Sequence, residues 1–131
     1  MGFEDFTQMN VWQLAFRLLI RVYEITREFP PEEKFGMVSD MRRAANSMTH
    51  NIAEGFGRYE ARDKTRFYKI SRGSSYELMS QSLASYELKF IKEKNVLDEL
   101  ISSSKTIIEE LNPLIKTLEN RGKPQPPPRE Q

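Results

Sequence analysis

Apolar residues recur at helical spacing in four stretches of the chain, and polar residues fill the positions between them. The first stretch begins at Asn10, an expected N-cap, and continues to Phe29. A second apolar set beside the first widens the buried arc of this helix. Such an arc suits a helix that packs between two neighbours of its own domain, or one that also contacts another subunit. The second set consists of Trp12, Phe16, Leu19 and Tyr23.

A second helix is expected after Pro30-Pro31, where Glu32 and Glu33 suit a helix start. Gly55 and Gly57 are expected to supply the permissive backbone of its end. One side of this helix is apolar, and the opposite side is a line of short polar residues with one carboxylate. That line is either a solvated face or a hydrogen-bonded contact with another chain. The apolar side holds Met41, Ala45, Met48, Ile52 and Phe56; the polar line holds Arg43, Ser47, His50, Asn51, Glu54 and Arg58.

The third helix is expected from Arg62 to residues 90–92, which makes it about 45 Å long at 1.5 Å per residue. Two stripes of this helix are expected to be buried at least in part. Gly73, Ser80 and Ala84 form a line of small residues, which allows close approach of another helix but also suits a free surface. The first stripe holds Phe67, Ile70, Ser71, Ser74, Leu78, Gln81, Ser85 and Leu88; the second holds Tyr68, Met79, Leu83, Tyr86 and Phe90.

A short turn at Lys94-Asn95 predicts an antiparallel fourth helix, whose single apolar stripe runs from Leu97 to Leu118. Pro113 lies inside this pattern and is expected to kink or split the helix near Asn112. Residues 121–131 are rich in proline and are expected to form a disordered or polyproline tail. The predicted fold of residues 1–120 is therefore all-α, an antiparallel up-down-up-down four-helix bundle with a long third helix.

Composition narrows the class of protein further. The chain of 131 residues suits one domain, and its lack of cysteine removes disulfides and thiolate metal sites. A cysteine-free sequence also suits a reducing cytoplasm. The first six residues carry no basic and apolar signal pattern, and no apolar run is long enough to span a membrane. We therefore expect a cytoplasmic protein without a membrane partner.

Positive charge is concentrated beyond the glycine pair. The net charge of the chain is +1, whereas residues 58–72 hold six basic and two acidic side chains. Cations in the first turn of a helix oppose the macrodipole, so phosphate binding would give them a reason to be there. Exposed aromatics among them could stack on a base, although a simply solvated charge run has the same composition. The six candidate nucleic-acid-binding residues are Arg58, Arg62, Lys64, Arg66, Lys69 and Arg72.

Evidence for catalysis or metal binding is weak. Glu54 and Glu77 lie in polar settings, but an acid/base pair must converge on a cleft, and pairing with arginine, serine or asparagine is the simpler interpretation. His50 and Glu54 share a helical face without the further ligands of a bundle metal site. Phosphate-loop, dinucleotide and nucleophile motifs are absent from the sequence. We therefore expect a non-enzymatic protein with no catalytic residue, metal, cofactor or small-molecule substrate.

The chain contains a series of short motifs: Val11-Trp12-Gln13, Phe29-Pro30, Arg42-Arg43-Ala44, Ser47, Asn51-Ile52-Ala53-Glu54-Gly55, Gly57-Arg58, Arg66-Phe67, Arg72-Gly73-Ser74 and Glu77-Leu78. Together they resemble the bacterial four helix bundle protein family, which includes proteins encoded within intervening sequences of the large-subunit ribosomal RNA gene. The family is related to the accessory variability determinant of diversity-generating retroelements. The similarity covers about residues 6–118, with Met48-Thr49 where members often have isoleucine and proline, so the second helix is expected to run straighter.

This resemblance implies a small bundle that assembles as a ring, a homopentamer in known members, with a basic surface proposed to bind nucleic acid. Our hypothesis is a homo-oligomer that binds RNA or DNA through backbone phosphates, and the alternative is a protein interaction module without a nucleic-acid role. Candidate residues for the subunit contact or a polar network are Arg43, Ser47, Asn51, Glu54, Gly73, Ser74 and Glu77.

Overall fold

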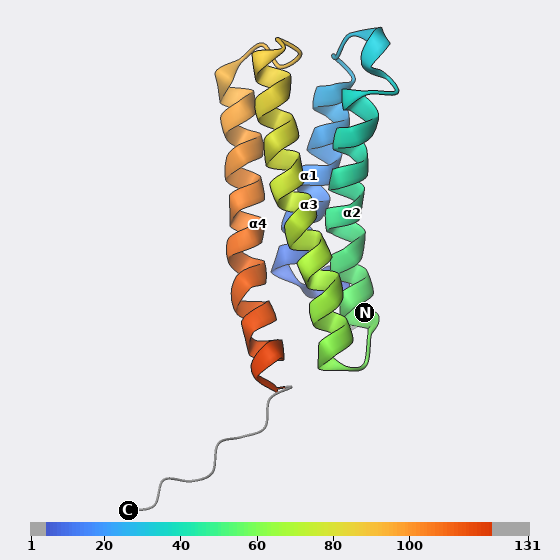
Figure 1. Ribbon diagram of the computed structural model, residues 1–131, viewed down its shortest axis with the longest axis vertical. Helices are drawn as coiled ribbons and strands as arrows, with labels where there is room; N and C mark the ends of the chain where they lie inside the picture. The colour runs from blue at the N-terminus through green and yellow to red at the C-terminus, as the bar shows by residue number, and fades with distance from the viewer. Residues whose placement is uncertain (1–4, 122–131) are drawn as a thin grey trace, which may run out of the picture.

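Four long helices make up the fold, which we describe for residues 5–121 of a computed structural model. A short 3-10 turn, η1 (Phe6–Gln8), precedes α1 (Asn10–Thr26), and a second, η2 (Pro31–Glu33), precedes α2 (Met37–Gly57). Helices α3 (Ala61–Glu87) and α4 (Lys94–Arg121) follow. Successive helices run in opposite directions (Figure 1), as expected for an up-down-up-down bundle. The predicted all-α four-helix fold is confirmed.

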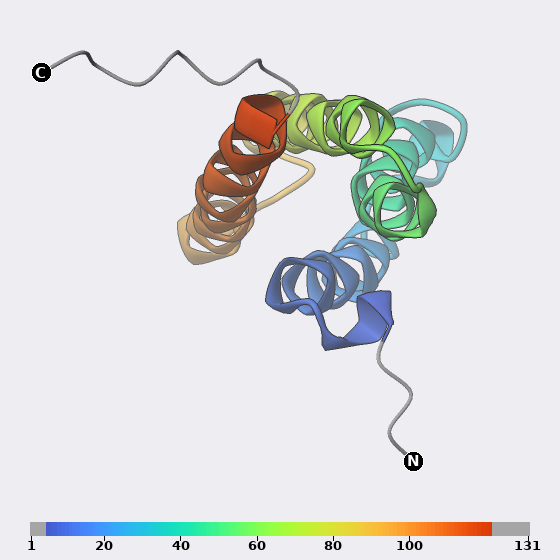
Figure 2. The same cartoon turned by 90° about the horizontal axis from the view of Figure 1, so that it is seen from below.

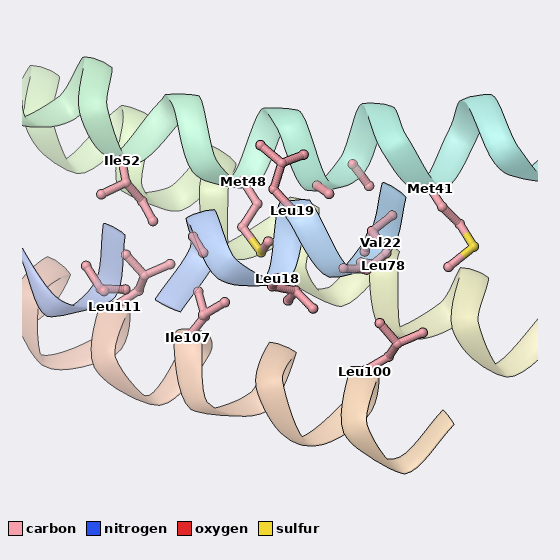
Figure 3. Packing of buried hydrophobic residues seen from close by; sticks show 14 of the residues in the cluster. Leu18, Leu19, Val22, Met41, Met48, Ile52, Leu78, Leu100, Ile107 and Leu111 are labelled. Atoms are coloured by element: carbon pink, nitrogen blue, oxygen red, sulfur yellow. The ribbon is translucent and has the colours of Figure 1, made fainter. Parts of the chain in front are cut away.

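Each helix packs beside the helices that precede and follow it, and α4 returns to α1 (Figure 2). The core lies between them and is filled from all four helices, for example by Val22, Met48, Leu78 and Leu100 (Figure 3). Complete burial of such a side chain contributes about 1.5–3 kcal/mol relative to its exposure. These residues lie at the helical spacing that the sequence pattern predicted.

Helix α3 buries serines where its neighbours bury leucine and isoleucine. Ser71, Ser75, Ser82 and Ser85 are completely buried, and their hydroxyls find partners inside the bundle. The Ser71 hydroxyl donates to the carbonyl of Met48 on α2 at 2.7 Å, and Ser75 and Ser82 donate to carbonyls of α3 itself. Small, satisfied side chains allow close packing without an unpaired buried polar group.

The ends of α1 and α2 differ from the prediction. Helix α1 begins at Asn10 but Met9 is its N-cap, and it ends at Thr26. Phe29 is buried in the following turn, against Phe90, which explains why its periodicity wrongly extended the helix. Helix α2 begins only at Met37, whose backbone N–H donates to the Glu33 carboxylate at 3.2 Å, so this acid caps the helix from outside it.

The predicted boundaries of α3 and α4 also change. Helix α3 ends at Glu87 because Lys89 adopts a positive φ of 68°, and the next two backbone N–H groups turn back to the Ser85 carbonyl. Lys94 and Asn95 open α4 and do not form a turn. Of the kink or split predicted near Asn112, the split does not occur, since α4 continues through Pro113, whose side chain is exposed. Arg121 ends α4, and the rest of the predicted tail, 122–131, lies outside the described residues.

Gly57 is the last residue of α2, as expected for a helix end, whereas Gly55 serves a different purpose from the one predicted. Neither Gly55 nor Gly57 has a positive φ, and both lie within the helix. A Cβ atom built on Gly55 would lie 2.7 Å from Cε1 of Tyr68, which is buried on α3. Gly55 is therefore required for close contact between helices, not for backbone freedom.

Candidate nucleic-acid interface

The six predicted cations lie at the corner between α2 and α3, at the end of the bundle where α1 begins and α4 ends (Figure 1). Arg58 follows the last residue of α2, and its backbone is extended. The other five occupy the first four turns of α3, where Glu60 makes no side-chain cap of the helix. We call the set the basic corner: Arg58, Arg62, Lys64, Arg66, Lys69 and Arg72.

A cleft of about 670 Å³ lies beside the basic corner, between the first turns of α3 and the last turns of α4. Three of the six cations line it, and two carboxylates lie among them. Hence the cleft carries a small positive charge. Its lining comprises Arg62, Asp63, Thr65, Arg66, Lys69, Leu118 and Glu119.

Two guanidinium groups of the basic corner lie against one aromatic ring. The Cζ atoms of Arg58 and Arg66 are 4.6 and 4.5 Å from the centroid of the Phe67 ring. Each contact is a cation–π interaction, and it restricts a long side chain that would otherwise sample many rotamers. Phe67 therefore holds two exposed cations in place, a role that the sequence pattern did not predict because it assigned this residue to the core.

Lys64 does not face outward with the arginines. Its ammonium donates to the carbonyls of Phe56 and Gly55 at 2.7 and 3.3 Å, which are among the last carbonyls of α2. A cation at this position complements the negative end of the α2 dipole. Burial lowers the pKa of Lys64 below its ordinary value, and the ammonium also lies over the Phe56 ring. The geometry gives Lys64 a structural contact with α2.

Lys69 and Arg72 contact α4. The Lys69 ammonium forms an ion pair with Glu119 at 3.3 Å, and the Arg72 guanidinium donates to the amide oxygen of Asn112 at 2.9 Å. Arg58 forms a long ion pair with Glu54 at 3.5 Å. Within residues 5–121, Arg62 and Arg66 form no ion pair, so their charges are the most available of the six.

Some of the residues predicted for a subunit contact or a polar network form hydrogen bonds within the chain. The Ser74 hydroxyl of α3 donates to the Ser47 hydroxyl of α2 at 2.8 Å, and the Asn51 amide donates to the Ser47 carbonyl at 2.7 Å. Glu77 accepts a hydrogen bond from Gln81 instead, and Arg43 is exposed. Glu54 is bound to Arg58 as described above, and Gly73 faces open space.

In the described part of the chain, Glu54 and His50 belong to no group of possible metal ligands, and Glu54 pairs with Arg58. His50 is exposed on α2, and no group of three or more possible ligands occurs between residues 5 and 121. Over the same residues, no helix is long and apolar enough to cross a membrane.

The wide apolar arc predicted for α1 is only partly covered by the bundle. Leu19 is buried, but Phe16 remains 41% exposed, and Ile20, which the predicted arc did not include, is 47% exposed four residues further along α1. The Trp12 ring stacks on Phe16 with 4.9 Å between centroids, and its buried indole Nε1 has no hydrogen-bond partner in the described part of the chain. Trp12, Phe16 and Ile20 thus form an aromatic and aliphatic surface, which we call the α1 patch.

Comparison with known protein families gives a match over most of the chain. The model of a family described as the 23S rRNA-intervening sequence protein matches residues 7–113. This range holds α1 to α3 and most of α4, including the whole basic corner and the α1 patch. No curated protein matches the chain.

Proposed function

The chain belongs to the 23S rRNA-intervening sequence protein family, and we propose that it is a non-enzymatic, cytoplasmic homo-oligomer that binds RNA or DNA through backbone phosphates. The observation that carries this proposal is the pair of exposed guanidinium groups of Arg62 and Arg66 at the edge of the cleft, which form no ion pair within residues 5–121. Guanidinium groups suit phosphate because they donate two parallel hydrogen bonds to it.

Assembly would increase the strength of such a surface. One basic corner offers only a few cations, but repetition of the corner around a symmetry axis adds their fields. The exposed α1 patch and the exposed Tyr76 and Leu83 on α3 support contact between copies, since apolar side chains there gain from removal of water. Subunit contact and phosphate binding are separate parts of the proposal and are tested separately.

The phosphate proposal is tested by titration of labelled oligonucleotides at several salt concentrations. If an assembly neutralises six or more phosphates, affinity should fall about a thousandfold or more between about 50 and 200 mM salt. The double variant Arg62→Gln with Arg66→Gln should weaken binding and reduce the salt slope by about one for each phosphate that is no longer neutralised. Helicity should not change, because both side chains are exposed.

The matched control removes two positive charges elsewhere. Lys92 and Lys105 are exposed and lie outside the basic corner, so their double replacement by Gln changes net charge equally and should leave the salt slope unchanged. Lys64→Gln should mainly lower the thermal stability of the protein, because this ammonium contacts the end of α2. Its effect on the affinity for the oligonucleotides should be small. An affinity that does not change with salt concentration would contradict the proposed phosphate binding. Equal losses of affinity in the two double variants would also contradict it.

A protein interaction module is the second candidate, and the exposed α1 patch favours it. Capture from a lysate with and without nuclease separates the two functions. Nucleic acid that is retained on the protein, but not on the Arg62/Arg66 variant, supports the first. A protein partner that remains bound after nuclease treatment and dissociates only when the α1 patch is changed supports the second.

A further inference from the structure

Three aromatic residues lie within residues 58–72, the stretch that holds the basic corner, and the structure separates their roles. Tyr68 is buried at 3% exposure beneath Gly55, and the Phe67 ring lies against Arg58 and Arg66. Tyr59 is 98% exposed. Of the three, only Tyr59 therefore presents an aromatic ring that a ligand can reach on both faces.

Tyr59 lies in the three-residue connection between α2 and α3, directly after Arg58. The residues on both sides of it, Arg58 and Glu60, have extended backbone, and the connection lies at the end of the bundle (Figure 1). Burial of its ring contributes nothing to folding, since nearly all of the ring is in water. A large aromatic side chain in that position beside exposed guanidinium groups has the composition of a nucleic-acid stacking site.

We propose that the basic corner binds a single-stranded segment of nucleic acid, with an unpaired base stacked on Tyr59 and the flanking phosphates held by Arg58, Arg62 and Arg66. This inference rests on the proposed phosphate binding and adds the class of ligand to it. A base within a duplex has both faces covered by its neighbours, so only an unpaired base can stack on a side chain. Any base can stack on the ring, because every base has a π-face. We therefore expect the protein to prefer single strands over duplexes, without a preference for sequence.

The test compares four fluorescent probes of about 12 nucleotides, a length within the range that single-strand sites cover. These are oligothymidylate, oligouridylate, an abasic strand and a duplex. Tyr59→Ala should weaken binding of oligothymidylate and oligouridylate about tenfold, while the abasic strand and the duplex keep their affinities. Tyr59→Phe should bind as the unchanged protein does, because it keeps the stacking ring. A difference between the two base-containing strands distinguishes RNA from DNA as the preferred ligand.

Phe35→Ala is the matched control, since Phe35 is 88% exposed and lies in the connection between α1 and α2, at the opposite end of the bundle from the basic corner (Figure 1). It should leave all four affinities unchanged. Equal affinity of the unchanged protein for the abasic strand and oligothymidylate, or an equal loss for all probes in Tyr59→Ala, would overturn the stacking inference. Salt-dependent binding would still support phosphate contact in that case. If no probe binds in a salt-dependent way, both proposals fail.

Discussion

Single side chains in this bundle have roles that their type alone does not reveal, and Tyr68 is an example. Burial raises the pKa of its phenol above the ordinary value near 10. The unfolded chain therefore loses this proton at a lower pH than the folded chain, and the folded state binds more protons above pH 10. Stability that is present below pH 10 should consequently be lost as the pH rises from 10 through the folded pKa.

Tyr68→Phe tests this expectation. Denaturant unfolding should show that the variant loses less stability than the unchanged protein between about pH 9 and 11, because phenylalanine has no phenol hydroxyl to ionise. Tyr76→Phe is the control, since the Tyr76 side chain is 56% exposed on the same helix. Parallel pH profiles for the unchanged protein and Tyr68→Phe would contradict the assignment.

Residue-level prediction from sequence succeeded where local pattern decides and failed where a distant contact decides. The spacing of Val22, Met48 and Leu100 placed each on a buried face, as the structure confirms. Lys64 was grouped with the arginines by proximity in sequence, but its ammonium contacts α2 carbonyls. No spacing rule shows which of several neighbouring cations turns back toward the preceding helix.

At the scale of helices, α2 and α3 illustrate how a glycine can be required by a neighbour. Gly55→Ala would place a methyl group 2.7 Å from the Tyr68 ring, and a buried ring has little room to move. We expect a loss of about 1–3 kcal/mol in the free energy of unfolding, as for other overpacked cores. Thermal or denaturant unfolding measures it.

Gly73→Ala is the matched control on α3, since a Cβ there meets nothing within 4 Å. It should stabilise the isolated chain by about 1 kcal/mol, the ordinary gain of alanine over glycine inside a helix. An equal effect of the two substitutions would show that the Gly55 contact does not limit packing. If Gly73→Ala instead lowers the molecular mass in solution, the outer face of α3 contacts another copy.

Helical periodicity in the sequence does not by itself predict where a helix ends or is interrupted. Phe29 and Phe90 keep helical spacing, but they pack on one another after their helices have ended. Pro113 was expected to kink or split α4, yet α4 continues through it. The carbonyl that Pro113 leaves without a backbone donor belongs to Glu109, and both residues are exposed, so water can reach that carbonyl. Tertiary packing determines where α1 and α3 end, and solvent access determines whether α4 tolerates Pro113. Neither can be read from the local sequence pattern.

At the scale of the whole molecule, assembly is the main expectation still to be measured. Phe16→Glu with Ile20→Glu places two charges on the α1 patch, where the single chain leaves both side chains about half exposed. We expect light scattering coupled to chromatography to show an oligomer for the unchanged protein and a smaller species for this variant, because charges at a buried interface are costly. Circular dichroism should be unchanged.

Leu88→Glu is the control, since Leu88 is 58% exposed beyond the end of α3, away from the α1 patch. It should leave the mass unchanged. A monomer of the unchanged protein at all concentrations would refute the homo-oligomer. The fold was predictable in number, order and direction of helices, whereas the subunit contact needs side chains of a second copy that one sequence pattern cannot position.

The direction of the chain through the bundle determines where a tether or tag should be attached for a binding measurement. The first described turn of α1 and the last turn of α4 both lie at the end that carries the basic corner (Figure 1). A sensor tether or fluorescent tag joined at either position would stand in the path of an approaching oligonucleotide. Attachment through a cysteine introduced at Phe35, in a chain with no other thiol, leaves that path open and gives every molecule the same orientation.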